Sequence, residues 1–262
     1  GAKLAHFTPQ VVPQGHDRAG TLLFVQPCDH LLPGPLAQPQ VHAQPPQTPV
    51  PRGVLMSDEA IQEVLKYWFD HVQDDTPLGP GDHRMKRWSG KSPDVDREVT
   101  EQFGALHQEV HAAAADGATP ASPEEAVAAV LVLDQFPRHL FRGSAQMYDS
   151  DALARELTYH ALEHLDLDDL PLPCRMFLYM PLMHAERVED QGLMVQLFRG
   201  LLDEAKSRAP QNVGFFEMAN GYAARHSEIV TRFGRFPHRN EILGRASPPD
   251  ELEFLKTADS GF

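Results

Sequence analysis

The stretch SPEEAVAAVLVLDQFPRHLFRG, residues 122–143, decides the fold class of this chain. Its first four residues form a capping box, in which a hydroxyl and a carboxylate three residues apart satisfy free N–H groups at a helix start. Residues 126–133 are apolar on nearly every side, which predicts a central, buried helix. Phe136-Pro137 should end this helix, because proline lacks an N–H and its ring crowds the preceding turn.

Further helices are predicted on both sides of this stretch. Ser57 and Ser92-Pro93 begin two of them, and others cover about 150–165, a segment that meets Pro181, a segment around 194–205, and about 213–233. Pro181 should kink or end its helix, and Ser247-Pro248 should cap the last one. No segment shows the alternation of a strand. The sequence therefore predicts an all-α fold of antiparallel helical pairs, either a bundle or a helical-repeat array.

Residues 1–55 differ in kind from the rest of the chain. They hold ten of the 23 prolines, few charges and no periodic apolar pattern, which predicts an irregular Pro-rich extension. They make a poor signal peptide, since no clean apolar stretch leads to a small-residue cleavage site. Met56 stands directly before a good helix start, so residues 56–262 are expected to form one all-helical domain.

The composition argues against several classes of protein. No apolar run reaches the roughly 18–20 residues that a membrane-spanning helix needs. The formal charge of −14 disfavours general binding to nucleic acid or to anionic membranes. Sequence signatures of common ATP-using, redox and acyl-transfer enzymes are missing from the sequence. We expect a soluble cytoplasmic protein without metal or cofactor.

The two cysteines do not predict a zinc ribbon or a disulfide framework. Cys28 and Cys174 lie far apart and outside any C-x-x-C spacing. Cys174, between a proline and an apolar helix, is expected to be a small buried hydrophobic residue.

Arginine and histidine gather around two similar turns, Phe136-Pro137 and Phe236-Pro237. Each turn follows a hydrophobic helix and presents a basic pair, then an apolar pair, then a glycine and an arginine. Arginine suits two-pronged contacts with carboxylate or phosphate, so the turns predict a pocket for a small anion or an acidic peptide end. The alternative is structural, with arginines pairing with acids to tie helix ends together. The candidate binding residues are Asp134, Arg138, Arg142, Asp190, His226, Arg235 and Arg239.

A third polar cluster, residues 183–191, follows Pro181. His184 and Glu186 are two residues apart and so lie on nearly opposite sides of a helix, which excludes a His-Glu-x-x-His metal site. On a broken helical turn they would converge, with Glu186 orienting His184 as a general base. A helix cap with a structural salt bridge is the alternative, and His238 is a second candidate for moving a proton.

The remaining histidines have less specific interpretations. His226 lies on an apolar stripe, where it is either a satisfied core residue or a neutral imidazole that accepts a proton. Two pairs at i, i+4 spacing lack an obvious third ligand nearby and are expected to be exposed helix histidines, not metal ligands. These pairs are His107/His111 and His160/His164.

Four ordered motifs resemble the bacterial family known as domain of unknown function number 924. They are LDQFPR at 133–138, FRG at 141–143, MPLMHAE at 180–186 with Asp190-Gln191, and RFGRFPHRN at 232–240. The resemblance runs from about Ile61 to Leu255. It implies an all-α fold similar to tetratricopeptide-repeat superhelices and brings no reaction with it. This chain departs from the family pattern at His139, where Asn is usual, and at Ala185, where Ser is common.

Two functional hypotheses remain open. In the first, an Arg/His/carboxylate pocket holds a small anionic ligand or substrate, and His184 with Glu186, or His238, moves a proton. In the second, the helices form an interaction module of the tetratricopeptide-repeat type, without catalysis, for a peptide or protein partner. A closed basic pocket favours the first, and an open groove with exposed aromatic residues favours the second. Whether the protein is an enzyme is left open.

Overall fold

The computed structural model describes residues 54–88 and 91–257, and every regular element in this part of the chain is helical. The all-α prediction is therefore confirmed for these residues. No helix within them is long and apolar enough to cross a membrane. Residues 1–53, which make up most of the predicted Pro-rich extension and include Cys28, lie outside the described residues.

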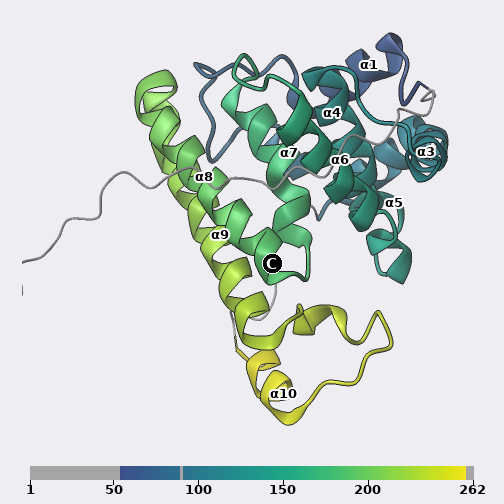
Figure 1. Cartoon of the computed structure of the whole chain (residues 1–262), viewed down its shortest axis with the longest axis vertical. Helices are drawn as coiled ribbons and strands as arrows, with labels where there is room; N and C mark the ends of the chain where they lie inside the picture. The colour runs from purple at the N-terminus through teal and green to yellow at the C-terminus, as the bar shows by residue number, and fades with distance from the viewer. Residues whose placement is uncertain (1–53, 89–90, 258–262) are drawn as a thin grey trace, which may run out of the picture. The chain divides into compact units, whose positions relative to one another are not determined.

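Along the chain α6 packs on α7, α7 on α8, and α8 on α9, and α8 and α9 form the most extensive of these pairs (Figure 1). The α-helices are α1 (Asp58–Phe69), α2 (Met85–Trp88), α3 (Pro93–Ala115), α4 (Pro123–Val130), α5 (Pro137–Leu140), α6 (Asp151–His164), α7 (Leu172–His184), α8 (Val188–Arg208), α9 (Val213–Phe233) and α10 (Pro249–Leu255). The other helical elements are a π-helical segment, η1 (Leu131–Gln135), and three 3-10 turns, η2 (Ala145–Tyr148), η3 (Pro210–Asn212) and η4 (Pro237–Arg239).

Serine caps begin two helices where the sequence predicts them. Ser57 Oγ accepts a hydrogen bond from Ala60 N–H at 3.2 Å, and Ser122 Oγ accepts one from Glu125 N–H at 3.1 Å. The carboxylate of Glu125 accepts from Ala121 N–H at 2.7 Å, one residue before the cap, and from Met56 N–H at 3.1 Å. The start of the helical region is thereby tied to α4.

The predicted cap of the last helix is wrong. The helix α10 begins after Pro248 without a side-chain cap. Ser247 Oγ instead accepts a hydrogen bond from the Asn240 side-chain amide at 2.9 Å. A hydroxyl near a helix start can serve a tertiary contact as well as a cap.

The apolar run 126–133 lies at the centre of the core, as predicted. Each of its residues is buried, and α4 packs against α1, α6 and α7. Aromatic rings of Trp68, Phe136 and Phe177 pack beside it, with the Trp68 ring 5.7 Å from that of Phe136 and 5.6 Å from that of Phe177. Fully burying one such side chain stabilises a fold by about 1.5–3 kcal/mol. Cys174 is buried as expected, and burial raises the pKa of its thiol to about 12.

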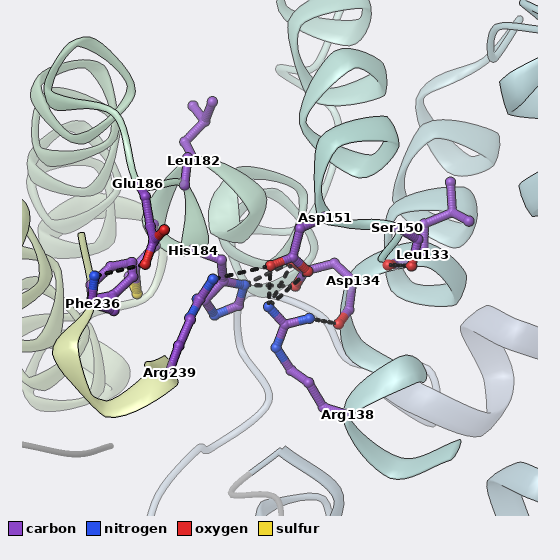
Figure 2. Close-up of polar contacts among 12 residues, drawn as sticks. Leu133, Asp134, Arg138, Ser150, Asp151, Leu182, His184, Glu186, Phe236 and Arg239 are labelled. Atoms are coloured by element: carbon purple, nitrogen blue, oxygen red, sulfur yellow. Dashed lines mark hydrogen bonds and ion pairs between the residues drawn. The ribbon is translucent and has the colours of Figure 1, made fainter. Parts of the chain in front are cut away.

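The predicted helix end at Phe136-Pro137 is wrong. Phe136 keeps helical backbone angles, φ −61° and ψ −38°, and its N–H donates to the carbonyl of Leu131, five residues earlier, at 2.9 Å. This π-turn carries the chain into α5, where Pro137 is the first residue. The carbonyl of Leu133, four residues before the proline, accepts the Ser150 hydroxyl at 2.6 Å instead (Figure 2). The helix accommodates Pro137, which has no N–H, because the π-turn widens it and the Ser150 hydroxyl takes the place of that N–H.

Pro181 also fails to end its helix, because α7 continues three residues further to His184. The carbonyls at the end of a helix need partners from outside it. The buried side-chain amide of Gln191 donates to the carbonyls of Met183 and Ala185, at 2.8 Å each, and to that of Leu182 at 3.2 Å. These bonds fix the last turn of α7 and with it the position of His184.

Candidate functional site

Five polar residues from five elements converge where helices end or begin. Asp134 belongs to η1, Arg138 to α5, Asp151 is the first residue of α6, His184 is the last residue of α7, and Arg239 ends η4. Figure 2 shows their side chains pointing toward one another. Four of the five are predicted site residues, and Asp151 is not among the predicted ones.

Asp134 is completely buried and organises one half of this cluster. Its carboxylate lies 2.7 and 3.0 Å from His184 Nδ1, accepts a hydrogen bond from Gln135 at 2.6 Å, and pairs with Arg138 at 3.4 Å. Burial alone would raise the pKa of Asp134, but Arg138 and His184 hold it below its usual value. Because the ionised carboxylate can only accept, His184 Nδ1 carries the hydrogen and Nε2 is unprotonated in the neutral ring.

Asp151 receives one arginine from each Phe-Pro turn. Its Oδ1 lies 3.1 Å from Arg138 Nη2, and its Oδ2 lies 3.4 Å from Arg239 Nη1. Arg138 also donates to the backbone carbonyl of Asp134. Burial raises the pKa of Asp151, and the two arginines oppose that rise. One buried carboxylate is therefore shared by two cations.

Arg239 is the less completely paired of the two arginines. Its side chain is 8% exposed, its Nε has no hydrogen-bond partner, and 3.4 Å to Asp151 is its one ion pair among the described residues. The guanidinium packs over the rings of Tyr148 and Phe236, with 4.5 and 4.7 Å from its carbon to the ring centroids. Burial lowers the pKa of Arg239, the charge of Arg138 adds to this effect, and the charge of Asp151 opposes it.

A cavity of about 300 Å³ opens between the two turns. Its lining is rich in cations and histidines and, among the described residues, includes no Asp or Glu. The cationic lining residues are Arg87, Lys91, Arg138, Arg142 and Arg239, and the histidines are His139, His184, His226 and His238. A second cavity, of about 370 Å³, shares Tyr148, His184 and Arg239 with the first.

The histidines of the cavity add little positive charge at neutral pH. Burial, with smaller contributions from neighbouring cations, lowers the pKa of His226 to about 3 and that of His238 to about 4. Burial and the charge of Arg138 also lower the pKa of His184, against the opposing effect of Asp134. His226 Nδ1 lies 2.8 Å from the carbonyl of Tyr222, so that nitrogen carries the hydrogen of the neutral ring. The arginines and Lys91 therefore supply the charge of the cavity.

Three predicted site residues form ion pairs of the kind that the structural alternative predicted. Glu186 does not orient His184: it accepts the Phe236 N–H at 2.7 Å and pairs with Arg245 at 2.5 Å. Asp190 accepts the hydroxyl of Tyr159 at 2.5 Å and pairs with Arg155 at 3.2 Å. Arg235 pairs with Glu251 at 2.8 Å, and it does not line the cavity.

Arg142 both forms an ion pair and lines the cavity. Its guanidinium makes two bonds of 2.7 Å to Asp96, whose carboxylate also lies 2.8 Å from His139 Nδ1. These contacts lower the pKa of Asp96, with Arg142 as the largest cause. Both Arg142 and His139 nevertheless line the cavity.

Sequence reasoning missed Asp151 and Tyr148. An acidic residue in the first turn after Ser150 is typical of any helix start, so Asp151 carried no special signal. Tyr148 lies in a short 3-10 turn outside every motif. The expectation that the paired histidines are exposed is wrong for His107, which is buried on α3 with its ring 5.4 Å from Phe141.

Comparison with known proteins places both turns and the residues between them in one family. A solved structure titled as a protein of unknown function, ATU0120 from Agrobacterium tumefaciens, is similar with a TM-score of 0.57 and 28% identity, over 76% of this chain and 97% of that one. A comparison with curated proteins gave no match. The family described as "Bacterial protein of unknown function (DUF924)" matches residues 64–259. The chain therefore belongs to the DUF924 family of bacterial proteins, as its four motifs implied.

Proposed function

We propose that the cavity between the two Phe-Pro turns binds a small organic anion through its carboxylate or phosphate group. The observation that carries the proposal is Arg239, a buried cation with one long ion pair, in a lining where the described residues include no carboxylate. Arg138 and Arg239 both donate to Oδ2 of Asp151, at 3.3 and 3.4 Å, so they lie within shared reach of one ligand.

The incomplete pairing of Arg239 is unfavourable without a ligand. A buried charge that lacks good partners costs several kcal/mol, and native proteins keep such groups mainly where they have a task. A guanidinium stacked on aromatic rings still offers its N–H edge, which suits two-pronged binding of carboxylate or phosphate. Asp151 pairs with Arg239 at 3.4 Å. An anion in the cavity would give the Arg239 guanidinium a second, closer partner.

The size of the cavity favours a metabolite over a macromolecule. Small-molecule sites occupy roughly 300–1,000 Å³, and this cavity of about 300 Å³ lies at the lower end of that range. The alternative is a tetratricopeptide-repeat-like module that binds an acidic peptide, and the half-exposed Met218 and Tyr222 on α9 are the observation that favours it. Neither of those two residues lines the cavity.

The test is thermal stability against a panel of anions at constant ionic strength. The panel contains phosphate, sugar phosphates, mono-, di- and tricarboxylates and an acidic peptide. A ligand of the folded state stabilises it by mass action, by about 2.7 kcal/mol at a hundred times its Kd. We expect at least one small anion to raise the melting temperature of the wild type, and Arg239→Met to abolish the rise.

Arg235→Met is the matched control, because Arg235 flanks the same proline but pairs with Glu251 outside the cavity. It should keep the response to the anion. An unchanged response in Arg239→Met, or no response of the wild type to any small anion, would contradict the proposal. A response to the acidic peptide alone would favour the interaction module.

A further inference from the structure

We propose that this cavity is an active site in which His184 takes a proton from water, and the water hydrolyses an ester of the bound anion. The inference rests on the proposed anion site and adds a reaction to it. It is carried by the placement of the His184–Asp134 pair on the wall of the cavity.

The two ring nitrogens of His184 have different surroundings. Nδ1 faces the buried carboxylate of Asp134 at 2.7 Å, and Nε2 has no hydrogen-bond partner among the described residues. The side chain is 12% exposed and lines both cavities. A carboxylate on Nδ1 fixes the tautomer that leaves a lone pair on Nε2, and it stabilises the imidazolium that forms when Nε2 accepts a proton. The low pKa of His184, caused by burial and by Arg138, keeps the ring neutral and able to accept.

The nucleophile that this site supplies is water. No Ser, Thr or Cys lines either cavity in the described part of the chain. The hydroxyl of Ser150 is already donated to the carbonyl of Leu133. A His–carboxylate pair without a neighbouring Ser, Thr or Cys has the arrangement of a general base for water, not that of a covalent triad.

The reaction balances with water as the one co-reactant. The water oxygen bonds to the ester carbonyl carbon while its proton moves to His184 Nε2, and the carbonyl electrons move onto the carbonyl oxygen. Arginines on the wall stabilise that negative charge, and Arg239 holds the anionic end of the substrate. The C–O bond to the alcohol then breaks, and the proton on Nε2 moves to the leaving oxygen. The products are a carboxylic acid, which ionises, and an alcohol.

The experiment measures release of 4-nitrophenol from mono-4-nitrophenyl esters of dicarboxylic acids, whose free carboxylate matches the cationic wall. We expect the wild type to hydrolyse at least one of them, at a rate that rises with pH and levels off as His184 loses its proton. His184→Gln should lower the rate by about 10²–10⁴-fold and keep the thermal response to anions. His107→Gln, which changes a buried histidine outside both cavities, should keep both the rate and the response.

The outcomes separate this inference from the proposed function. Anion binding without hydrolysis above the rate of His184→Gln overturns the reaction and leaves the binding site standing. No anion binding by the wild type overturns both. A further measurement by NMR in D₂O follows exchange of the C–H next to the carboxylate of the panel acids, and exchange that depends on His184 without ester hydrolysis would also overturn the proposed reaction. Asp134→Asn, if it folds, should lower the rate and shift the pH profile, which a purely structural pair would not do.

Discussion

The two Phe-Pro turns resemble each other in sequence and differ in backbone. In the first turn Phe136 stays helical and donates its N–H to Leu131 within a π-turn. In the second, Gly234 ends α9 in the left-handed region at φ 69°, and the N–H of Phe236 donates to the carboxylate of Glu186. Both phenylalanines are fully buried. Both copies of the motif therefore bury a phenylalanine ring, while tertiary partners decide the backbone conformation around it.

The order of the basic pair is reversed between the turns, yet an arginine from each reaches Asp151. It is Arg138-His139 in the helical turn and His238-Arg239 in the 3-10 turn. Among the described residues, Arg138 has Asp134 and Asp151 as carboxylate partners, whereas Arg239 has Asp151 alone. Arg138 therefore braces the first turn more firmly, and Arg239 is the arginine that the proposed function assigns to the ligand.

The largest expected effect follows removal of the carboxylate that braces the first turn. Asp134→Ala leaves Arg138 short of a partner and His184 without its acceptor in a buried place. Breaking a buried pair costs about 3–5 kcal/mol, measurable by urea unfolding. Asp203→Ala, which removes an exposed pair with Lys206, should cost far less, because water screens exposed ion pairs. Similar losses in the two variants would show that Asp134 does not brace the site.

The two arginines should respond to different degrees to the same substitution. Arg138→Met removes the partner of two carboxylates and should lower the free energy of unfolding by about 3 kcal/mol. Arg239→Met removes an incompletely paired buried charge but also one partner of Asp151; these effects oppose each other, so it should lower stability by less than Arg138→Met does. Urea unfolding without ligand measures both. Equal losses would remove the distinction between a bracing and a ligand-binding arginine.

The histidines of the two turns should differ in acid sensitivity. The folded pKa of His238 is about 4, below the unfolded value of about 6.5, so the unfolded chain binds more protons between these values. The contribution of His238 to stability should therefore be fully present above about pH 6.5. It should be lost as the pH falls toward about 4, by at most about 1.4 kcal/mol per pH unit. The pKa of His139 is also lowered by burial, but Asp96 opposes that effect.

The measurement is urea unfolding of His238→Gln and His139→Gln at several pH values between about 4 and 7. His238→Gln should flatten the loss of stability more than His139→Gln. The exposed His164, with a side chain 57% exposed, gives the control His164→Gln, which should leave the pH dependence as it is. If the free energy of unfolding falls more steeply with pH in His238→Gln than in the wild type, the lowered pKa of His238 is contradicted.

A local effect tests the backbone of the first turn. Ser150→Ala leaves the buried carbonyl of Leu133 without the hydroxyl that replaces the missing proline N–H. An unsatisfied buried acceptor costs about 1–3 kcal/mol. Pro137→Ala in the Ser150→Ala background restores an N–H four residues after Leu133 and should recover part of that loss. If the double-mutant cycle shows no coupling energy between positions 150 and 137, the Ser150 hydroxyl does not replace the N–H that Pro137 lacks.

Local patterns were sufficient for the fold class and for most helix starts. The serine caps, the apolar run 126–133 and the stripes at i, i+3 and i+4 each involve residues within one or two turns, so their effect can be predicted from the sequence. The helix end at Phe136-Pro137 was predicted wrongly because local rules count the missing N–H but not its replacement. That replacement, the Ser150 hydroxyl, lies just before α6, 17 residues after Leu133.

By itself, the sequence determined that the chain is helical and that its arginines and histidines gather at two turns, because these features depend on near neighbours. Only the tertiary structure decided the partners. His184 lies against Asp134, 50 residues away, and not against Glu186, and Arg239 reaches Asp151, 88 residues away. An arginine has many acids available along a chain with 37 of them. Ion pairs depend on distances between helices, and packing sets those distances.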